Sequence, residues 1–352
     1  MPPRARALED RTAQHEAHEV TRRRGPHRCP GVLWTQSPNG RPGPARRGRR
    51  ERRTRVVNTG RTRSCETQET PEPPRGTMAD AGDVSAVAAA AAAAAAASAL
   101  PAGNAQPLAG RVAIVTGASR GIGRAIAAHL SSLGASVVLG YASRADEADA
   151  LAASLPRAVA VRADVSDEAG VRSLFDAAES AFGVGGAHIL VANAGVNDDT
   201  YPAVADTTTE AFDRVVAVNL RGAFLCLREA ANRVPRGGGG RIVAVTSSVV
   251  GSLPPGYAAY TASKAAVEAL VRTMAKELRG TRVTANCVAP GATASDMFFK
   301  GKSEDMVRRA VEICPMERLG EPGDIAPVVG FLCTDAAEWV NGQVIRANGG
   351  YV

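Results

Sequence analysis

The sequence predicts an α/β protein whose core is a doubly wound, seven-stranded parallel sheet in a single domain, preceded by a disordered N-terminal extension. From Arg111 onwards, short runs rich in β-branched residues alternate with longer helical stretches, which is typical of repeated strand-helix-strand units. The first run leads directly into a glycine-rich turn, and Asp, Asn or Gly residues close later runs. Before about residue 108 the chain has no apolar period that could build a core.

The positive charge of the chain is concentrated in its first part. Residues 1–77 contain 18 Arg, no Lys and 8 acidic residues, a net charge of +10, whereas the rest carries 24 basic and 27 acidic residues, a net charge of −3. Such an Arg- and Pro-rich composition predicts disorder. We therefore expect residues 1–107 to be a disordered Arg/Pro/Ala-rich extension and residues 108–352 to be the folded domain, which has no role in nucleic-acid binding.

Several features bear on the location of the protein. Met78 would serve as the start of a shorter protein, and the arginines before it also suit an organelle transit sequence. The alanine tract Ala88–Ala97 is too short and too weakly apolar to span a bilayer. Six cysteines without CxxC pairs or metal-ligand spacing predict free thiols and no metal site. We expect a cytoplasmic protein with no membrane partner, and the plastid is the alternative location.

Strands and helices are expected to alternate along the domain. The strands are short apolar runs, and the helices have apolar residues at three- and four-residue spacing. The expected strands are Val112–Val115, Ser136–Leu139, Val159–Arg162, His188–Ala192, Arg241–Thr246, Val283–Val288 and Gln343–Arg346. The expected helices are Arg124–Leu133, Ala145–Ser154, Glu168–Phe182, Phe212–Glu229, Tyr260–Leu278 and Ile325–Cys333. Ligands of such sheets bind at the carboxyl ends of the strands, so the residues that follow each strand form the candidate site.

The segment Thr116–Gly123 connects the first strand to the first helix. Its glycines have the spacing Gly-x-x-x-Gly-x-Gly, which lets the backbone turn tightly and approach a diphosphate. Free N–H groups and the positive dipole of the helix N-terminus attract such an anion. The segment therefore predicts a Rossmann-type dinucleotide site that includes Gly117, Ser119, Arg120, Gly121, Ile122 and Gly123.

The end of the second strand bears on the choice between NAD and NADP. An acidic residue there binds the ribose 2′-hydroxyl and repels a 2′-phosphate. No carboxylate stands at that place, whereas Ser143, Arg144 and Arg120 offer a hydroxyl and two cations that suit a phosphate. NADP(H) is therefore the preferred cofactor, and Asp146, a little further on, leaves NAD(H) open.

Polar residues also close the third and fourth strands. Asp164 and Val165 follow the third strand, and Asn193 and Gly195 follow the fourth, so that they extend the predicted cofactor site. Each of these residues could instead be a helix cap or a turn residue, which is the commonest role of Asp, Asn and Gly after a strand, and this alternative stays open.

Tyr260 and Lys264 form the candidate proton-transfer site. They stand at i and i+4 on a predicted helix, which places their Cβ atoms about 5–6 Å apart on one face. The pKa of a free tyrosine is near 10, too high for efficient acid–base work at neutral pH. An ammonium at about 4 Å stabilises a phenolate by about 4 kcal/mol at an effective dielectric constant near 20, and burial opposes this effect. We expect a net lowering of the pKa of Tyr260.

Ser248 is the candidate hydrogen-bond donor to a substrate oxygen. It stands just past the end of the fifth strand and a short loop before Tyr260, so it is placed to stabilise charge that develops on that oxygen. Tyr257 is the rival phenol, but Thr261 rather than a lysine stands one turn after it. Tyr260 is therefore the expected acid–base residue.

In this order, the motifs resemble those of the short-chain dehydrogenase/reductase family, and the resemblance covers essentially all of residues 108–352. They are Gly117-x-x-x-Gly121-x-Gly123, Asn193-Ala194-Gly195, Asn219, Ser248, Tyr260-x-x-x-Lys264 and Pro290-Gly291. Within the family, the tail from Asn341 to Tyr351 is similar to plant NADPH-dependent aldehyde reductase-like members. The region around Thr116–Gly123 is close to 3-oxoacyl-acyl carrier protein reductases.

The resemblance implies a role for each catalytic candidate. Tyr260 would exchange the proton with the substrate oxygen, and Lys264 would hold the nicotinamide ribose and assist Tyr260. Ser248 would orient the carbonyl group. Asn219 would keep a helix open for a water that links Lys264 to solvent, although by itself it is only a polar residue in an amphipathic helix.

The resemblance also extends the cofactor site and implies a lid. Asp164 would lie at the adenine and Asn193 beside the cofactor, and the residues against the nicotinamide would be Pro290, Gly291 and the backbone of Thr293. Ser295 stands where the family often has threonine, which puts cofactor contact there in doubt. Residues 297–318 would form a mobile lid, rich in charge and short of strong caps.

The implied function is NADPH-dependent reduction of an aldehyde or ketone to an alcohol, with a small-molecule carbonyl compound as substrate. Reduction of a 3-oxoacyl-acyl carrier protein is the alternative. A dinucleotide-binding regulatory protein without catalytic activity is the alternative from another class, and the intact Ser248, Tyr260 and Lys264 argue against it. A homotetramer or homodimer is also implied, built from the helices after Ala211 and Tyr260 with the last strand at a second interface.

Overall fold

A computed structural model describes residues 106–183 and 185–352 of the chain. Nearly all of the predicted extension, including Met78, the alanine tract, Cys29 and Cys65, lies outside these residues. Leu108, near the start of the described residues, is fully buried.

The predicted seven-stranded parallel sheet is confirmed. Its order is β3-β2-β1-β4-β5-β6-β7, and each neighbouring pair is parallel. This order reverses direction between β1 and β4, as expected of a doubly wound sheet. The strands are β1 Val112–Thr116, β2 Ser136–Tyr141, β3 Ala158–Arg162, β4 Ile189–Ala192, β5 Arg241–Val245, β6 Thr284–Pro290 and β7 Val344–Ala347.

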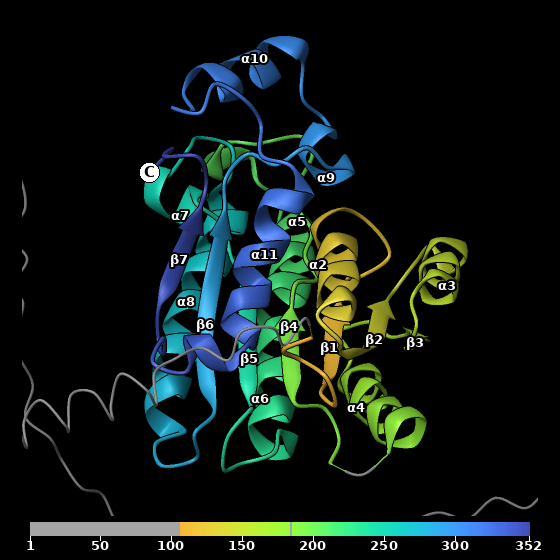
Figure 1. The fold of residues 1–352 in the computed structure, drawn as a ribbon. Coiled ribbons are helices and arrows are strands. Elements are labelled where there is room, and N and C mark those ends of the chain that lie inside the picture. The colour runs from red at the N-terminus through yellow and green to blue at the C-terminus, as the bar shows by residue number, and fades with distance from the viewer. Residues whose placement is uncertain (1–105, 184) are drawn as a thin grey trace, which may run out of the picture. The chain divides into compact units, whose positions relative to one another are not determined.

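Helices cover both faces of the sheet (Figure 1). The longer helices are α2 Gly121–Ser132, α3 Ala145–Ser154, α4 Glu168–Phe182, α5 Thr209–Val216, α6 Ala223–Arg233, α8 Ala258–Glu277, α10 Glu304–Glu312 and α11 Pro322–Cys333. The short helices are α7 Val249–Ser252, α9 Asp296–Phe299 and the 3₁₀ turns η1 Val204–Asp206 and η3 Asp335–Ala337. Helices α2 and α11 pack against each other on one face, and α4, α6 and α8 cover the other.

The two faces of β1 enter two different hydrophobic cores. Val112 and Ile114 pack with the core under α4, α6 and α8, whereas Ala113 and Val115 pack with the core under α2 and α11. This alternation follows from the two-residue period of a strand, and burial on both faces explains why the strand reads as a continuous apolar run.

The predicted helix Phe212–Glu229 is interrupted. Between α5 and α6 the chain forms a π-helical segment, η2 Ala217–Gly222, in which Asn219 lies fully buried. The Asn219 side chain donates to the carbonyl oxygen of Val196 and accepts from the Val196 backbone N–H, both at 2.8 Å. Wider turns of this kind are frequent at functional sites. Amphipathic spacing alone does not reveal the extra residue in the turn.

Helices α9 and α10 lie beyond the carboxyl ends of the strands (Figure 1). Helix α9 begins at Asp296, one residue before the predicted lid, and we refer to residues 296–318 as the lid. The expectation that this segment lacks strong caps is wrong. The Ser295 hydroxyl accepts from the Phe298 backbone N–H, and the Ser303 hydroxyl accepts from the Met306 backbone N–H, both at 3.3 Å. A serine that immediately precedes a helix satisfies a backbone N–H that the helix itself cannot pair.

The described residues bear on membrane-spanning helices and on metal-binding clusters. Among them no helix is both long and apolar enough to cross a bilayer. Nor do these residues bring three or more His, Cys, Asp or Glu side chains together in a metal-binding group. Of the described cysteines, Cys226, Cys287 and Cys333 are buried and Cys314 is partly exposed, and all four are free thiols.

We predict that Leu174→Ala in α4 destabilises the domain by about 2–5 kcal/mol, because the change leaves a cavity in a closely packed core. Leu174 is fully buried and packs directly over Gly140 of β2. Urea unfolding measures the change. Val204→Ala, at a site that is 76% exposed, serves as the control and should shift stability by less than about 0.5 kcal/mol. Equal effects of the two substitutions would contradict the assigned packing.

Candidate active site

One cavity of about 980 Å³ is lined by residues that follow all seven strands. It brings together nearly every candidate that the sequence predicts. The candidates that line it are Gly117, Ser119, Arg120, Gly121, Ile122, Gly123, Ser143, Asp164, Val165, Asn193, Gly195, Ser248, Tyr260, Lys264, Pro290, Gly291 and Thr293. Arg144 and Asn219 lie outside the lining.

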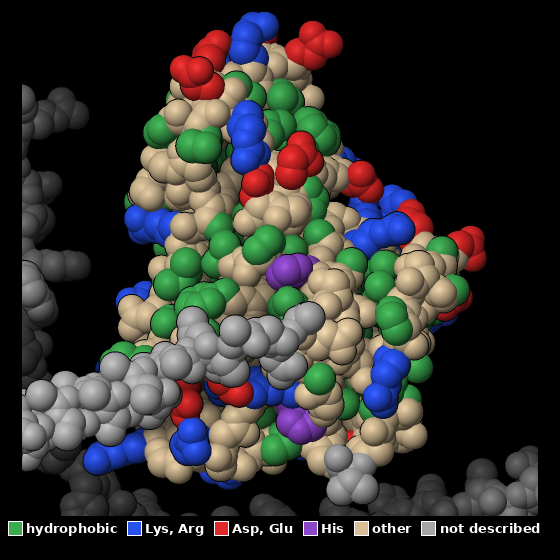
Figure 2. Space-filling model, in the orientation of Figure 1, with side chains coloured by type: hydrophobic (Ala, Val, Ile, Leu, Met, Phe, Trp, Pro, Cys, Tyr) green, Lys and Arg blue, Asp and Glu red, His purple; other side chains and the backbone are tan. Residues whose placement is uncertain are grey.

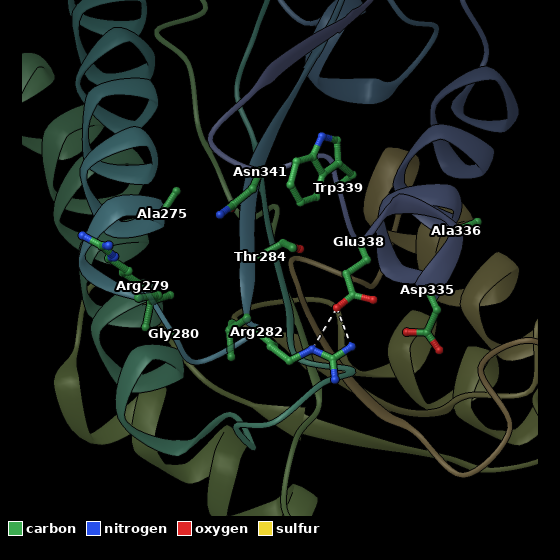
Figure 3. A pocket seen from close by; sticks show the side chains of 12 residues that line it. Ala275, Arg279, Gly280, Arg282, Thr284, Asp335, Ala336, Glu338, Trp339 and Asn341 are labelled. Carbon is green, nitrogen blue, oxygen red and sulfur yellow. Dashed lines mark hydrogen bonds and ion pairs between the residues drawn. The ribbon is translucent and has the colours of Figure 1, made fainter. Parts of the chain in front are cut away.

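A second hollow, of about 660 Å³, lies at the start of β6 and shares no residue with this cavity. Figure 3 shows the Arg282–Glu338 ion pair and the nearby Trp339 and Asn341 in it. Trp339 is 99% exposed. Because this hollow is at the amino end of the strand, it is separate from the site predicted at the carboxyl ends.

The glycine loop has the geometry that a diphosphate requires. Gly117 and Gly121 adopt φ angles of +65° and +54°, a region that favours glycine. A Cβ at Gly123 would lie 2.2 Å from the carbonyl oxygen of Gly117, so only glycine fits at the start of α2. The loop thus leaves the N-terminus of α2 open to close backbone approach, and the residues present fit a dinucleotide.

Asn193 braces this loop from the neighbouring strand. Its side-chain amide donates to the carbonyl oxygens of Thr116 and Gly117 at 2.9 and 3.2 Å. Its backbone N–H and that of Ala194 both donate to the Thr116 hydroxyl at 3.0 Å. Asn193 therefore fixes the end of β4 to the end of β1 and holds the loop in shape.

Asp164 forms a local turn at the end of β3. Its carboxylate accepts from the Ser166 backbone N–H at 2.9 Å and from the Ser166 hydroxyl at 2.7 Å. The cap of α4 is Asp167 instead, which accepts from the Gly170 N–H at 3.1 Å. Of the two alternatives that the sequence left open, Asp164 is a turn residue, and it also lines the cavity.

The residues after β2 and β6 form the other walls of the cavity. Arg144 has a φ angle of +67° and pairs with Glu147 at 2.6 Å, beside Ser143 in the wall. Across the cavity, the Gly291 N–H donates to the Ala347 carbonyl at 3.0 Å, and a Cβ at Gly291 would lie 2.9 Å from the Asn348 Cα. The backbone at Gly291 is therefore closely held against the end of β7.

Tyr260 and Lys264 lie on one face of α8, as predicted, and both line the cavity. The Lys264 Nζ lies 5.7 Å from the centre of the Tyr260 ring. It donates to the carbonyl oxygen of Val245, at the end of β5, at 2.8 Å. The two side chains are thus neighbours, and the ammonium is anchored to the sheet.

Aromatic and sulfur-containing side chains surround the far end of the cavity. The ring of Tyr257 lies 6.3 Å from that of Tyr260, in an edge-on arrangement. From the lid, Met297, Phe298 and Met306 complete the lining. This end offers an apolar wall next to the phenol of Tyr260, which suits the organic part of a carbonyl substrate.

The sequence and the structure were compared with known proteins. Residues 117–352 match the family model described as enoyl-(acyl carrier protein) reductase. A chloroplastic NADPH-dependent aldehyde reductase-like protein from Arabidopsis thaliana is 55% identical over 259 residues, which cover 70% of this chain and 96% of that protein. The chloroplastic NADPH-dependent aldehyde reductase 2 of the same plant is 51% identical over 257 residues, 69% of this chain and 94% of its own.

The chain belongs to the short-chain dehydrogenase/reductase family. This is a family of oxidoreductases. Among solved structures, an angucycline C-6 ketoreductase with bound NADP is similar with a TM-score of 0.65 and 36% identity, over 70% of this chain and 96% of that one. The resemblance found in the motifs is therefore confirmed.

Two adjacent serines occupy the place where this short-chain dehydrogenase/reductase was expected to have one donor. The Ser247 hydroxyl lies close enough to the Tyr260 phenol to lower its pKa. The fully buried Ser248 hydroxyl instead donates to the Ala289 carbonyl at 2.9 Å and accepts from the Asn348 side-chain amide at 3.0 Å. Ser248 therefore has two hydrogen-bond partners within the protein, and its role as donor to a substrate oxygen stays a prediction.

Ser247 is the functional candidate that the sequence analysis missed. The tandem serines Ser247 and Ser248 both follow β5, and counting residues cannot tell which hydroxyl turns towards α8. The hydrogen-bond partner of Ser248 distinguishes the two serines. Asn348, beyond β7, donates to Ser248 and to the Val352 carbonyl at 3.2 Å, so one of the two serines has a structural partner.

Burial is the largest influence on the pKa values of Tyr260 and Lys264. It raises the pKa of Tyr260 to about 12, against a smaller lowering by the Ser247 hydrogen bond. It lowers the pKa of Lys264 to about 8, against a smaller rise from Cys287. The expected net lowering of the Tyr260 pKa is therefore wrong for this structure. Desolvation disfavours the charged phenolate and is the largest influence on the pKa of this group.

Asn219 packs near Lys264 and fixes the part of α8 that carries it. Beyond its bonds to Val196, its side-chain amide donates to the Ser263 hydroxyl at 3.2 Å, next to Lys264 in α8. Gly195 fits between them, since a Cβ there would lie 3.3 Å from the Asn219 Oδ1 and 3.4 Å from the Lys264 Nζ. Asn219 therefore joins η2, the loop after β4 and α8 into one unit.

We predict that stability depends on Lys264 between pH 8 and 10.5. Because its pKa is lowered to about 8, the folded protein loses this proton near pH 8, whereas the unfolded chain keeps it to about pH 10.5. The unfolded state then binds more protons, so this contribution to stability rises with pH across the window. Relative to Lys264→Met, the wild type should gain roughly 3 kcal/mol from pH 7 to pH 10.5.

Urea unfolding at several pH values measures this gain. Lys276→Met is the matched control, because Lys276 lies exposed near the end of the same helix. The control should follow the wild type at every pH. A constant difference between wild type and Lys264→Met across the window would show that the lysine titrates normally in the folded protein.

Proposed function

We propose that this short-chain dehydrogenase/reductase catalyses the NADPH-dependent reduction of an aldehyde or ketone to an alcohol. The observation that carries the proposal is the meeting of three groups in one cavity. The Tyr260 phenol, the nearby Ser247 hydroxyl and the neighbouring Lys264 ammonium lie at one part of the cavity, and the glycine loop lies at another.

Tyr260 is the proposed proton donor. With its pKa raised to about 12, the phenol is protonated throughout the neutral range. This is the form that reduction requires, because the substrate oxygen gains negative charge as the carbonyl carbon accepts a hydride. The bound nicotinamide supplies that hydride. Tyr260 then transfers its proton to the oxygen and completes the alcohol.

Ser247 is the proposed donor that positions the substrate oxygen. A hydroxyl that already reaches the Tyr260 phenol lies close to any oxygen that the phenol protonates. Ser248 has a different proposed role. Through Ala289 and Asn348 it joins the loop after β5 to the ends of β6 and β7, and so it keeps Ser247 in place.

Lys264 is proposed to hold the nicotinamide ribose and to favour the phenolate after proton transfer. Its charge is fixed near the phenol by the carbonyl oxygen of Val245. With a pKa of about 8 it is mostly protonated at neutral pH. Asn219 positions the segment that carries Lys264, through Ser263 and Val196.

NADP(H) is the proposed cofactor. The two arginines expected at a 2′-phosphate both approach Asp296. Arg120 lines the cavity, and Arg144, which follows the lining residue Ser143, lies outside the lining. NADPH appears in the names of the two Arabidopsis relatives, and the similar ketoreductase contains NADP. These names support the preference over NAD(H).

A second candidate function is reduction of a substrate attached to acyl carrier protein. The description of the matched family model, an enoyl-(acyl carrier protein) reductase, favours it. The sequence had suggested the related reduction of a 3-oxoacyl group. Small carbonyl compounds remain the first proposal, because two relatives that are more than half identical to this chain are named aldehyde reductase or aldehyde reductase-like proteins.

Location and assembly are proposed on narrower grounds. Both Arabidopsis relatives carry the word chloroplastic in their names, which favours the plastid over the cytoplasm for this chain. A homodimer or homotetramer through α5 and α6 is supported by two exposed aromatic side chains, Phe212 and Phe224, which are 43% and 42% exposed. Aromatic side chains of this kind are enriched at protein interfaces.

We predict that the protein oxidises NADPH with one or more members of a panel of small aldehydes and ketones, followed by the loss of absorbance of NADPH. Acetoacetyl and enoyl thioesters in the same panel separate the two candidate functions. Tyr260→Phe should lower kcat by about 100-fold or more, because it removes the proton donor. Turnover that is unchanged in Tyr260→Phe would refute the assignment, and no turnover of any compound would favour a regulatory dinucleotide-binding protein.

The roles of the two serines predict opposite outcomes for two closely matched variants. Ser247→Ala should lower kcat by about 100-fold or more, because it removes a donor to the developing oxyanion. Ser248→Ala should lower kcat by less than about tenfold and should mainly lower stability, because its bonds are internal. Steady-state kinetics and urea unfolding of both variants measure the difference. A greater loss of kcat in Ser248→Ala would restore Ser248 as the donor.

A further inference from the structure

Asp296, the first residue of α9, lies against two arginines, of which Arg120 lines the cavity and Arg144 lies outside the lining. Its Oδ2 is 2.7 Å from a terminal nitrogen of Arg120 and 3.9 Å from one of Arg144. Figure 2 shows basic and acidic side chains next to one another on the surface in the region of α9 and α3. One carboxylate of the lid thus approaches both cations.

The glycine loop and the lid also meet next to this ion pair. A Cβ at Gly121 would lie 3.5 Å from the Cβ of Ser295, which caps α9. Asp296 is therefore held over the start of α2 by the backbone on which it stands. The Arg120 hydrogen bond keeps the pKa of the Asp296 carboxyl below its usual value, so the group stays charged at neutral pH.

A 2′-phosphate would compete with this carboxylate. Under the proposed function, on which this step rests, Arg120 and Arg144 are the cations that bind the phosphate. A phosphate carries up to two negative charges and is repelled by a fixed carboxylate at the same guanidinium groups. A ribose with a free 2′-hydroxyl is neutral there and meets no such repulsion. The same carboxylate therefore affects the two cofactors differently.

We propose that Asp296 is a specificity-determining residue that competes with the 2′-phosphate of NADPH for Arg120 and Arg144. It lowers the preference for NADPH over NADH below the value that the two arginines alone would set. Because Asp296 stands on α9, exchange of its ion pair for a phosphate links cofactor choice to the lid.

Asp296→Asn tests the proposal, because it removes the charge and keeps the size of the side chain. We expect the Kd for NADPH to fall by about three- to tenfold and the Kd for NADH to change by less than about twofold, since the loss of one exposed charge pair has effects of this order. Fluorescence titration of the full-length protein measures both constants without turnover. The gain in NADPH affinity should shrink at high salt, because exposed charges are screened.

Asp305→Asn is the matched control. Asp305 lies in the same lid, on α10, is similarly exposed and pairs with Arg308 instead of a cofactor arginine. This variant makes the same change in net charge and should alter neither Kd by more than about twofold. A general electrostatic effect of the lid would instead appear equally in both variants and would overturn the proposal.

The remaining outcomes separate this proposal from the proposed function. Equal changes in the two Kd values for Asp296→Asn, no change, or weaker NADPH binding would each refute the role of Asp296 while the proposed function stands. A wild-type protein that binds neither nucleotide would refute the proposed function itself. In an Arg120→Gln background, Asp296→Asn should have at most half its effect on log Kd for NADPH, and an undiminished effect would also overturn the proposal.

Discussion

The parallel direction of all seven strands is the constraint on which the site depends. Since parallel strands end at one edge of the sheet, each loop that can reach a ligand leaves from that edge. The glycine loop, Asn193, the two serines and Gly291 come from four different strands, yet they line one cavity. Helix α8 adds Tyr260 and Lys264 to the same place, because its first turns pack beside the end of β5.

The desolvation of Tyr260 and Lys264 lowers the stability of the folded protein but sets the protonation states that the proposed function needs. The Lys264 ammonium donates a hydrogen bond to the carbonyl oxygen of Val245, and the Ser247 hydroxyl lies near the Tyr260 phenol. Desolvation makes the charged form of each group less favourable, so the phenolate of Tyr260 and the ammonium of Lys264 both cost free energy in the folded protein. Perturbed pKa values of this kind gather at active sites, and here they leave the phenol in its acidic form.

Properties with a regular period were predictable from the sequence, and properties set by one side-chain direction were not. The strands, α3 and α4 follow from apolar spacing, and α3 and α4 agree with prediction to the residue. The π-helical segment at Asn219 is wider than an α-helical turn, and the single helix predicted over Phe212–Glu229 does not include it. Ser247 and Ser248 differ only in where their hydroxyls point, and the pKa of Tyr260 depends on burial, which a spacing of four residues cannot reveal.

The brace that Asn193 provides has a consequence for the way a cofactor is captured. Its amide bonds to the carbonyls of Thr116 and Gly117 form within the protein, so the loop has its shape before any nucleotide arrives. A preorganised loop requires little induced fit and loses little conformational entropy on association. The affinity for a nucleotide then depends mainly on the contacts that it makes and little on the cost of shaping the loop.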